Sequence, residues 1–118
     1  MAWKVLGTAE FEEWLLGSPE NIQRAVDFSV RLLEEKGPTL DHPYSSSISG
    51  SKFGSMRELR MKAGGRACRV FYIFDPKRRA ILLIGGIKTD NKNWYRKYIA
   101  KADAIYEAVL RSGGFGHD

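Results

Sequence analysis

The sequence is poor in the residues that stabilise a fold covalently or through a metal. It has one cysteine, Cys68, and two histidines, His42 and His117, among 118 residues. A disulfide within the chain is excluded, and this cysteine usage is typical of a reducing compartment. One cysteine and two distant histidines do not make a zinc site, so we expect no metal. Gly85-Gly86 lacks the flanking pattern of a phosphate-binding loop, so we also expect no cofactor.

Long hydrophobic segments are missing as well. The longest apolar run, Ala80 to Ile87, is far too short to cross a bilayer. No apolar stretch follows a basic start at the N-terminus, as it would in a secretory signal. We therefore expect a soluble, cytoplasmic protein with no membrane partner. Hydrophobic residues make up 43% of the chain and charged residues 28%, which is typical of a globular domain that buries a core.

Acidic residues are scarce in one part of the chain. Residues 56–101 hold thirteen Lys and Arg against three Asp and Glu, a net charge of +10 in a protein of net +5. Residues 1–36 are acidic instead, with a net charge of −3. A basic block this concentrated favours a polyanionic partner such as RNA. A solvated, lysine-rich surface is the alternative, and composition does not separate the two.

The periodicities predict an α+β domain over residues 1–111 and a flexible tail at 112–118. A strand at 3–6 comes first. One helix follows, capped by Thr8 and ending at Leu16, and a second runs from Ser18-Pro19-Glu20 to Gly37-Pro38. Three strands then form a meander, and a last helix covers about 91–111. The strands are predicted at 56–62, 66–74 and 79–88.

Residues 37–55 show no clear period, and we predict a long loop there, ordered by Tyr44, Ile48 and Phe53. Loops of this length in small domains are often functional. A flexible connector is an equally good interpretation.

The turn at Gly64-Gly65 fixes a hairpin register if its loop has two or four residues. Arg60 then lies opposite Arg69, and one face carries Glu58, Arg60, Lys62, Arg69, Phe71 and Ile73. The other face is apolar and must be covered by helices; it carries Leu59, Met61, Cys68, Val70, Tyr72 and Phe74. Across the next turn, Arg69 is predicted to pair with Ile84. The Arg69 face then gains Leu82, Ile84, Gly86 and Lys88.

Arg60 opposite Arg69 is a like-charge pair, which costs on the order of 0.2–1 kcal/mol unless something offsets it. Glu58, two residues away on the same face, could bridge the two arginines in a structural ion network. Alternatively the arginines form a phosphate clamp, because guanidinium groups bind phosphate oxygens in a bidentate way.

Aromatic residues near this basic face are candidates for stacking on nucleic-acid bases. Phe71 shares the face, and Trp94 and Tyr95 begin the last helix. For Trp94 a core position is favoured, whereas Tyr95 is better placed for exposure. His42 in the long loop is a candidate general base or simply a polar surface residue.

The order of elements, with Glu58-Leu59-Arg60, Arg69-Val70-Phe71-Tyr72 and Lys88, resembles the RelE/ParE superfamily of bacterial toxins over about residues 3–110. Within it, the sequence is most similar to the HigB-like, phage-derived Gp49-like branch. The resemblance implies a small antiparallel sheet, made of the meander and the N-terminal strand. This sheet would pack against two N-terminal helices, with a further helix at the C-terminus.

The resemblance also implies the toxin half of a type II toxin–antitoxin pair. Typical RelE-like members cut mRNA in the ribosomal A site without a metal. The ribose 2′-hydroxyl attacks the adjacent phosphate. Carried over, Arg69 contacts the scissile phosphate, and the implied partner is a small helix-turn-helix antitoxin. Arg60, which shares the predicted face, would stabilise the transition state together with Arg69. The remaining RNA-binding candidates are Lys62, Arg66, Phe71, Lys88, Lys92 and Trp94.

The chain departs from the pattern of RelE itself, which has lysines where this chain has Met56 and Glu58. No histidine stands beside Tyr95, where some relatives carry one. The proton-transfer group therefore stays open between Glu58, Tyr95 and His42. ParE-like relatives inhibit DNA gyrase on the same fold, so gyrase inhibition is an alternative function. A non-catalytic, basic RNA-binding module is another.

Overall fold

A five-stranded mixed sheet forms the centre of the computed structural model, which describes residues 2–114. The strand order is β1-β5-β4-β3-β2. β1 pairs with β5 in parallel and the other pairs are antiparallel, so the N-terminal strand makes the sheet mixed rather than wholly antiparallel as expected. The bounds are β1 (Val5–Gly7), β2 (Ser45–Ser47), β3 (Arg57–Ala63), β4 (Arg66–Phe74) and β5 (Ala80–Ile87).

Three α-helices accompany the sheet: α1 (Ala9–Leu16), α2 (Glu20–Lys36) and α3 (Trp94–Arg111). The Thr8 hydroxyl accepts a hydrogen bond from the Phe11 amide, which confirms the predicted cap of α1. Ser18, at the predicted start of α2, does not cap the helix: its hydroxyl donates to the Trp14 carbonyl, and the helix starts after Pro19. The tail was predicted to be flexible at 112–118, and its residues 115–118 lie outside the described part.

The predicted loop at 37–55 contains two ordered elements, a 3-10 turn η1 (Gly37–Thr39) and the edge strand β2. β2 consists of three serines and pairs with β3, which places Ser46 opposite Glu58. A serine run has no hydrophobic alternation, so the sequence pattern did not reveal this strand. Ile48 and Phe53 pack against the core as expected, whereas Tyr44 is 44% exposed.

The predicted register of the β3–β4 hairpin is confirmed, including Arg60 opposite Arg69. The predicted register of β4–β5 is wrong: Arg69 pairs with Gly86, not with Ile84. An irregularity between Phe71 and Tyr72 shifts the pairing. Leu82 consequently pairs with Tyr72 and joins the opposite face of the sheet from Arg69.

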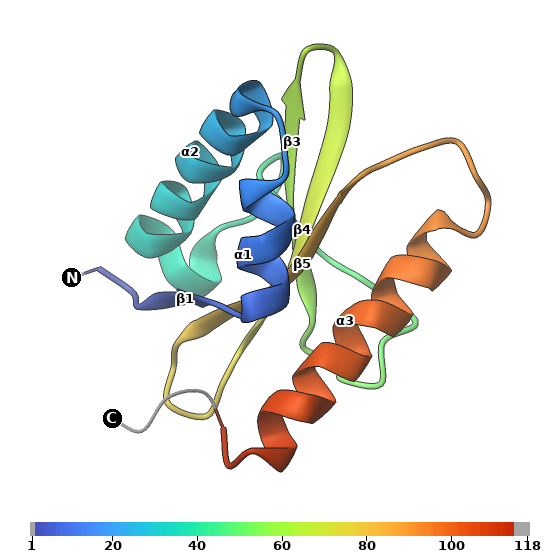
Figure 1. Cartoon of the computed structure of the whole chain (residues 1–118). Helices are drawn as coiled ribbons and strands as arrows, with labels where there is room; N and C mark the ends of the chain where they lie inside the picture. Colours follow the sequence, from blue (N-terminus) through green and yellow to red (C-terminus); the bar gives the residue numbers. More distant parts are fainter. Residues whose placement is uncertain (1, 115–118) are drawn as a thin grey trace.

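Helices cover both faces of the sheet. α1 and α2 lie on one face and α3 crosses the other (Figure 1). The α1–α2 face is the predicted apolar face, with Leu59, Cys68, Val70 and Tyr72 fully buried. α3 covers part of the face that carries Arg69 and builds a second core there. Its buried residues include Phe71, Ile73, Ile81, Leu83, Trp94 and Tyr106.

Two glycines of β5 let the helices on both faces approach closely. A Cβ at Gly86 would lie 2.6 Å from the Tyr98 ring of α3, and one at Gly85 would overlap the Trp14 ring of α1. Glycine is therefore required at both positions by packing, not by phosphate binding. Within residues 2–114, no helix has the length and apolar character needed to cross a membrane.

Candidate functional site

Four of the predicted site residues meet in one hydrogen-bonded cluster on the α3 side of the sheet. Arg60 Nη1 donates to Glu58 Oε2 at 2.9 Å, and the Tyr95 hydroxyl donates to Glu58 Oε1 at 2.8 Å. Arg69 Nε donates to the Tyr95 hydroxyl at 3.2 Å and lies 3.6 Å from Glu58 Oε1. We call Glu58, Arg60, Arg69 and Tyr95 the Glu58 cluster. It joins β3, β4 and the first turn of α3.

A fifth residue, Ser46 of β2, supports the cluster and was not predicted. Its hydroxyl donates to Glu58 Oε2 at 2.8 Å. The register places Ser46 directly opposite Glu58, so the contact follows from the strand pairing. The sequence signal that could have found it is the serine run 45–47, interpreted as an edge strand beside β3.

The cluster is largely removed from water. Glu58 is 3% and Arg69 8% exposed, whereas about a third of the Arg60 side chain remains accessible. Buried charges require partners, and Glu58 finds an arginine for each carboxylate oxygen. Glu58 therefore bridges Arg60 and Arg69, as the ion-network interpretation expected.

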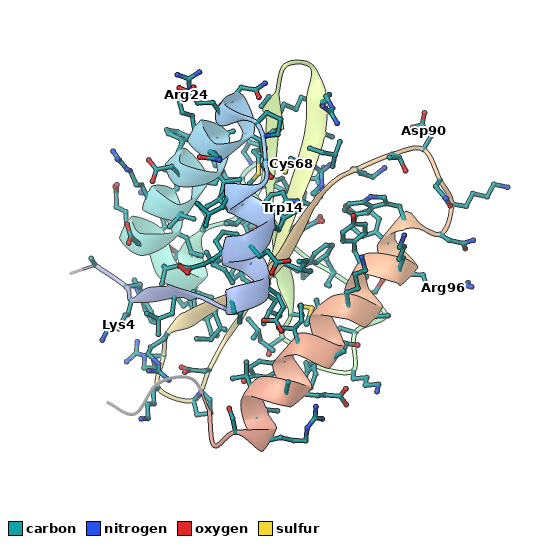
Figure 2. All side chains as sticks on the ribbon, viewed as in Figure 1. Lys4, Trp14, Arg24, Cys68, Asp90 and Arg96 are labelled. Carbon is teal, nitrogen blue, oxygen red and sulfur yellow. The ribbon has the colours of Figure 1, made fainter. Side chains whose placement is uncertain are left out.

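Burial keeps the Tyr95 phenol beside the carboxylate, and the Cys68 thiol on the other face of the sheet, protonated at neutral pH. Burial raises the pKa of Tyr95 above its ordinary value of 10.0; the hydrogen bond from Arg69 opposes this rise and the one to Glu58 adds to it. Burial also raises the pKa of Cys68 to about 11. Cys68 lies on the side of the sheet facing α1 and α2 (Figure 2). Its protonated thiol is not a nucleophile there, but its carbonyl accepts from Arg69 Nη1 at 2.9 Å.

Positive charge exceeds negative charge at the cluster, because two guanidinium groups face one carboxylate. Lys88 adds a third cation, with Nζ 5.8 Å from the centre of the Tyr95 ring. Lys62 and Arg66 on the hairpin and Lys92 before α3 are exposed to solvent. Such cations can contact phosphates that flank the cluster.

Two of the predicted RNA-binding residues are not available for stacking. Phe71 is fully buried under α3, and Trp94 is 5% exposed. The Trp94 indole donates to the Ile87 carbonyl at 2.8 Å and stacks on Tyr98 with ring centres 4.5 Å apart. Base stacking on these two rings is therefore wrong as a prediction, because α3 and the sheet bury both of them in the second core, whereas the core position favoured for Trp94 is confirmed.

His42 is not part of the Glu58 cluster. It is exposed in the turn before β2 and, within residues 2–114, takes part in no hydrogen bond or ion pair. Three or more His, Cys, Asp or Glu side chains gather nowhere in the described part of the chain as a metal-binding group would.

A hollow of about 340 Å³ opens directly onto the cluster. Glu58 and Tyr95 line it together with Ser47, Ile48, Ser49 and Ile99. Its volume is within the range of ligand-binding pockets in proteins. The cluster therefore combines a carboxylate, a phenol and guanidinium groups at the edge of a space that admits part of a substrate.

Residues 13–107 match the family described as "Phage derived protein Gp49-like". The chain is 38% identical over 104 residues to the Mycobacterium tuberculosis protein named "Putative toxin HigB3". The matched region covers 87% of this chain and 90% of the relative. It is 36% identical over 108 residues to "Putative toxin HigB2" of the same organism. That match covers 87% of this chain and 54% of the relative.

Proposed function

The chain belongs to the HigB-like, phage-derived Gp49-like family of the RelE/ParE superfamily, and from this premise we propose that it is the toxin of a type II toxin–antitoxin pair. Its activity is the cleavage of mRNA on the ribosome, without a metal, which stops translation. Its place of action is then the cytoplasm. Two similar proteins of Mycobacterium tuberculosis that are named as HigB toxins support the toxin assignment.

The observation that carries the nuclease proposal is the composition of the Glu58 cluster. Cleavage by a ribose 2′-hydroxyl needs a group that accepts its proton, positive charge for the phosphorane-like transition state, and a proton for the leaving 5′-oxygen. The cluster supplies a carboxylate, two guanidinium groups and a protonated phenol within hydrogen-bonding distance of one another. A surface that only binds protein requires no such combination.

Each residue has one role in the proposed reaction. Glu58 accepts the proton of the 2′-hydroxyl, whose oxygen forms a bond to phosphorus while the bond from phosphorus to the 5′-oxygen breaks. Tyr95 gives its proton to the leaving 5′-oxygen. It then regains a proton from Glu58 through the hydrogen bond between the two side chains. Arg60 and Arg69 stabilise the charge on the phosphate oxygens. The products are a 2′,3′-cyclic phosphate and a 5′-hydroxyl end.

Arg69 is equipped for this role although it is buried. Hydrogen bonds to Tyr95 and to the Cys68 carbonyl hold its guanidinium in one position. These bonds use two of the five N–H groups of a guanidinium. Preorganised donors stabilise a transition state without reorganising during the reaction. Lys62, Arg66, Lys88 and Lys92 then hold phosphates on either side.

Tyr95→Phe should lower cleavage by about 10²-fold, because it removes the proposed proton donor and keeps the ring. The free energy of unfolding should fall by only about 1 kcal/mol, the typical contribution of one hydrogen bond. Tyr98→Phe is the matched control, since the Tyr98 hydroxyl makes no hydrogen bond within the described residues. Single-turnover cleavage of mRNA on ribosomes is the measurement. Equal rates for Tyr95→Phe and wild type would remove Tyr95 from the mechanism.

Induced expression of the protein alone should arrest growth by stopping translation. In pulse-labelled cells, incorporation of amino acids should fall before incorporation of thymidine. The reverse order would instead favour gyrase inhibition, as in ParE-like relatives. Expression of the Arg69→Ala variant is the control, and it should leave both rates unchanged.

We propose that the partner is a small helix-turn-helix antitoxin that covers the basic surface of residues 56–101. Their net charge of +10 favours an acidic segment in the partner. Co-expression of the neighbouring reading frame should restore amino-acid incorporation in the labelled cells. A complex that forms only through the acidic helices α1 and α2 would contradict this placement.

A further inference from the structure

The hollow beside the Glu58 cluster continues into a second one along α3. The first is about 340 Å³ and the second about 580 Å³, and Ser49, Tyr95 and Ile99 line both. We call the two together the α3 groove. One wall is the segment 47–52, which begins with the last residue of β2, and the other is formed by residues 95–107 of α3. Arg96 of the second hollow lies at the N-terminal end of α3, near the loop that carries Asp90 (Figure 2).

Asp103 of α3, which is 5% exposed, holds the opposite wall of the groove, the segment 47–52, in place. Its carboxylate accepts from the Ser51 hydroxyl at 2.6 Å and from the Lys52 amide at 3.0 Å. Phe53 packs edge-on against Tyr106, with ring centres 4.9 Å apart. These contacts fasten the segment to the helix, so the groove exists before any ligand binds. A preformed site loses little ordering entropy on binding.

The charges in and around the groove differ between its two ends. In the second hollow, Lys52 pairs with Glu107 at 3.4 Å, and Arg96 and Asp103 also line it, so the formal charges of its lining sum to zero. At the other end, Arg60, Arg69 and Lys88 outnumber Glu58. A phosphate is therefore attracted to the cluster, whereas an uncharged group fits the groove.

The remaining lining residues suit a flat, uncharged ring with polar edges. Ile48 and Ile99 provide apolar contacts, and Ser47 and Ser49 provide hydroxyls that both donate and accept hydrogen bonds. Arg96 adds a planar guanidinium, on which bases stack. Single-stranded RNA offers such rings, one for each phosphate.

We propose that the α3 groove binds one unstacked nucleobase of single-stranded RNA while the adjacent phosphate lies at the Glu58 cluster. The inference rests on the proposed nuclease function and deepens it, because it assigns a base-binding subsite to residues outside the cluster. Sequence preference in cleavage then originates at Ser47, Ser49 and Arg96.

Ser49→Phe tests the proposal, because Ser49 is exposed and lines both hollows, so a phenyl ring there obstructs the groove. Ser55→Phe is the matched control, since Ser55 is exposed in the same loop and lines neither hollow. Two probes are used, a 2′-O-methyl oligoribonucleotide that cannot be cleaved and an abasic 2′-O-methyl oligomer with the same number of phosphates. Binding is measured by fluorescence anisotropy at one fixed salt concentration.

Wild type and Ser55→Phe should bind the base-bearing oligomer about tenfold or more tightly than the abasic one, given the usual strength of base contacts. Ser49→Phe should lose this preference and still bind the abasic oligomer like wild type. The proposal is overturned if Ser49→Phe keeps the preference, or if wild type has none. Neither probe can be cleaved, so this binding assay is independent of the separate assay of mRNA cleavage on ribosomes. If the protein shows the base preference but cleaves no mRNA, the nuclease function is wrong and the groove remains a base-binding site.

Discussion

Arg69→Ala should lower mRNA cleavage by about 10²–10³-fold, the usual loss when one preorganised donor to a transition state is removed. The same variant should be less stable than wild type by about 1.5–3 kcal/mol, the typical contribution of a hydrogen-bonded charged group. The reason is burial: Arg69 is 8% exposed and lies 3.6 Å from a Glu58 carboxylate that is itself buried. Relief of the like-charge pair with Arg60 brings no gain, because Glu58 already lies between the two arginines.

A structural role and a catalytic role of Arg69 both predict that Arg69→Ala is less stable than wild type. The variant that separates the two roles is therefore Arg69→Lys. Lysine keeps the charge and loses the planar fork that binds phosphate in a bidentate way. A catalytic arginine predicts cleavage that stays low in Arg69→Lys even at temperatures where circular dichroism shows a folded protein. If the folded Arg69→Ala or Arg69→Lys variant cleaves at the wild-type rate, the arginine is structural only.

Glu58→Gln should have an effect of similar size, lowering cleavage by about 10²–10⁴-fold, because glutamine cannot accept the 2′-hydroxyl proton. Stability should fall by roughly 3–5 kcal/mol, since Arg60 and Arg69 would then face each other without an acid. The measurements are single-turnover cleavage on ribosomes and urea unfolding monitored by tryptophan fluorescence.

Two further variants separate the charge of Glu58 from its position. Ser46→Ala keeps the carboxylate and removes one hydrogen bond of 2.8 Å, so most cleavage should remain. Glu20→Gln removes an exposed carboxylate of α2, away from the cluster and the groove, and should change neither cleavage nor stability appreciably. A Glu58→Gln variant that cleaves like Glu20→Gln would exclude the carboxylate as the base.

The pairing of β3 with β4 could be predicted because two local features agree. Gly64 and Gly65 both have positive φ, 59° and 75°, as a two-residue hairpin turn requires. The alternation on either side then fixes which side chains share a face. Arg60 opposite Arg69, with Glu58 beside them, follows from that pairing alone.

Other parts of the fold depend on contacts that no local pattern reports. Arg69 pairs with Gly86 rather than Ile84, a shift of two residues: one arises at the turn, where Phe74 pairs with Ala80, and the other at the irregularity between Phe71 and Tyr72. Both pairings of Arg69 place residues 84 and 86 on its face, so the alternation does not separate them. The strand β2 exists because three serines find an open edge at β3, and serine has no strong preference for strands.

In the site, too, some residues could be placed from local sequence patterns, whereas others depend on tertiary contacts. The sequence predicted Glu58, Arg60 and Arg69 on one face, but the meeting of Tyr95 with Glu58 depends on α3 crossing that face. The amphipathic pattern of α3 gives its buried stripe and not the side of the sheet that it covers. Phe71 was predicted to bind RNA for that reason, although α3 buries its ring; for Trp94, a candidate too, the favoured core position is the one observed.

The central claim is that the Glu58 cluster cleaves mRNA, and the most direct test maps 5′ ends on translating ribosomes incubated with the purified protein. We expect new 5′-hydroxyl ends within reading frames for wild type, with 2′,3′-cyclic phosphate on the upstream fragments. Folded Arg69→Ala and Glu58→Gln variants should leave the mRNA intact. Intact mRNA with wild-type protein on actively translating ribosomes would contradict the claim, as would equal cleavage by all three proteins.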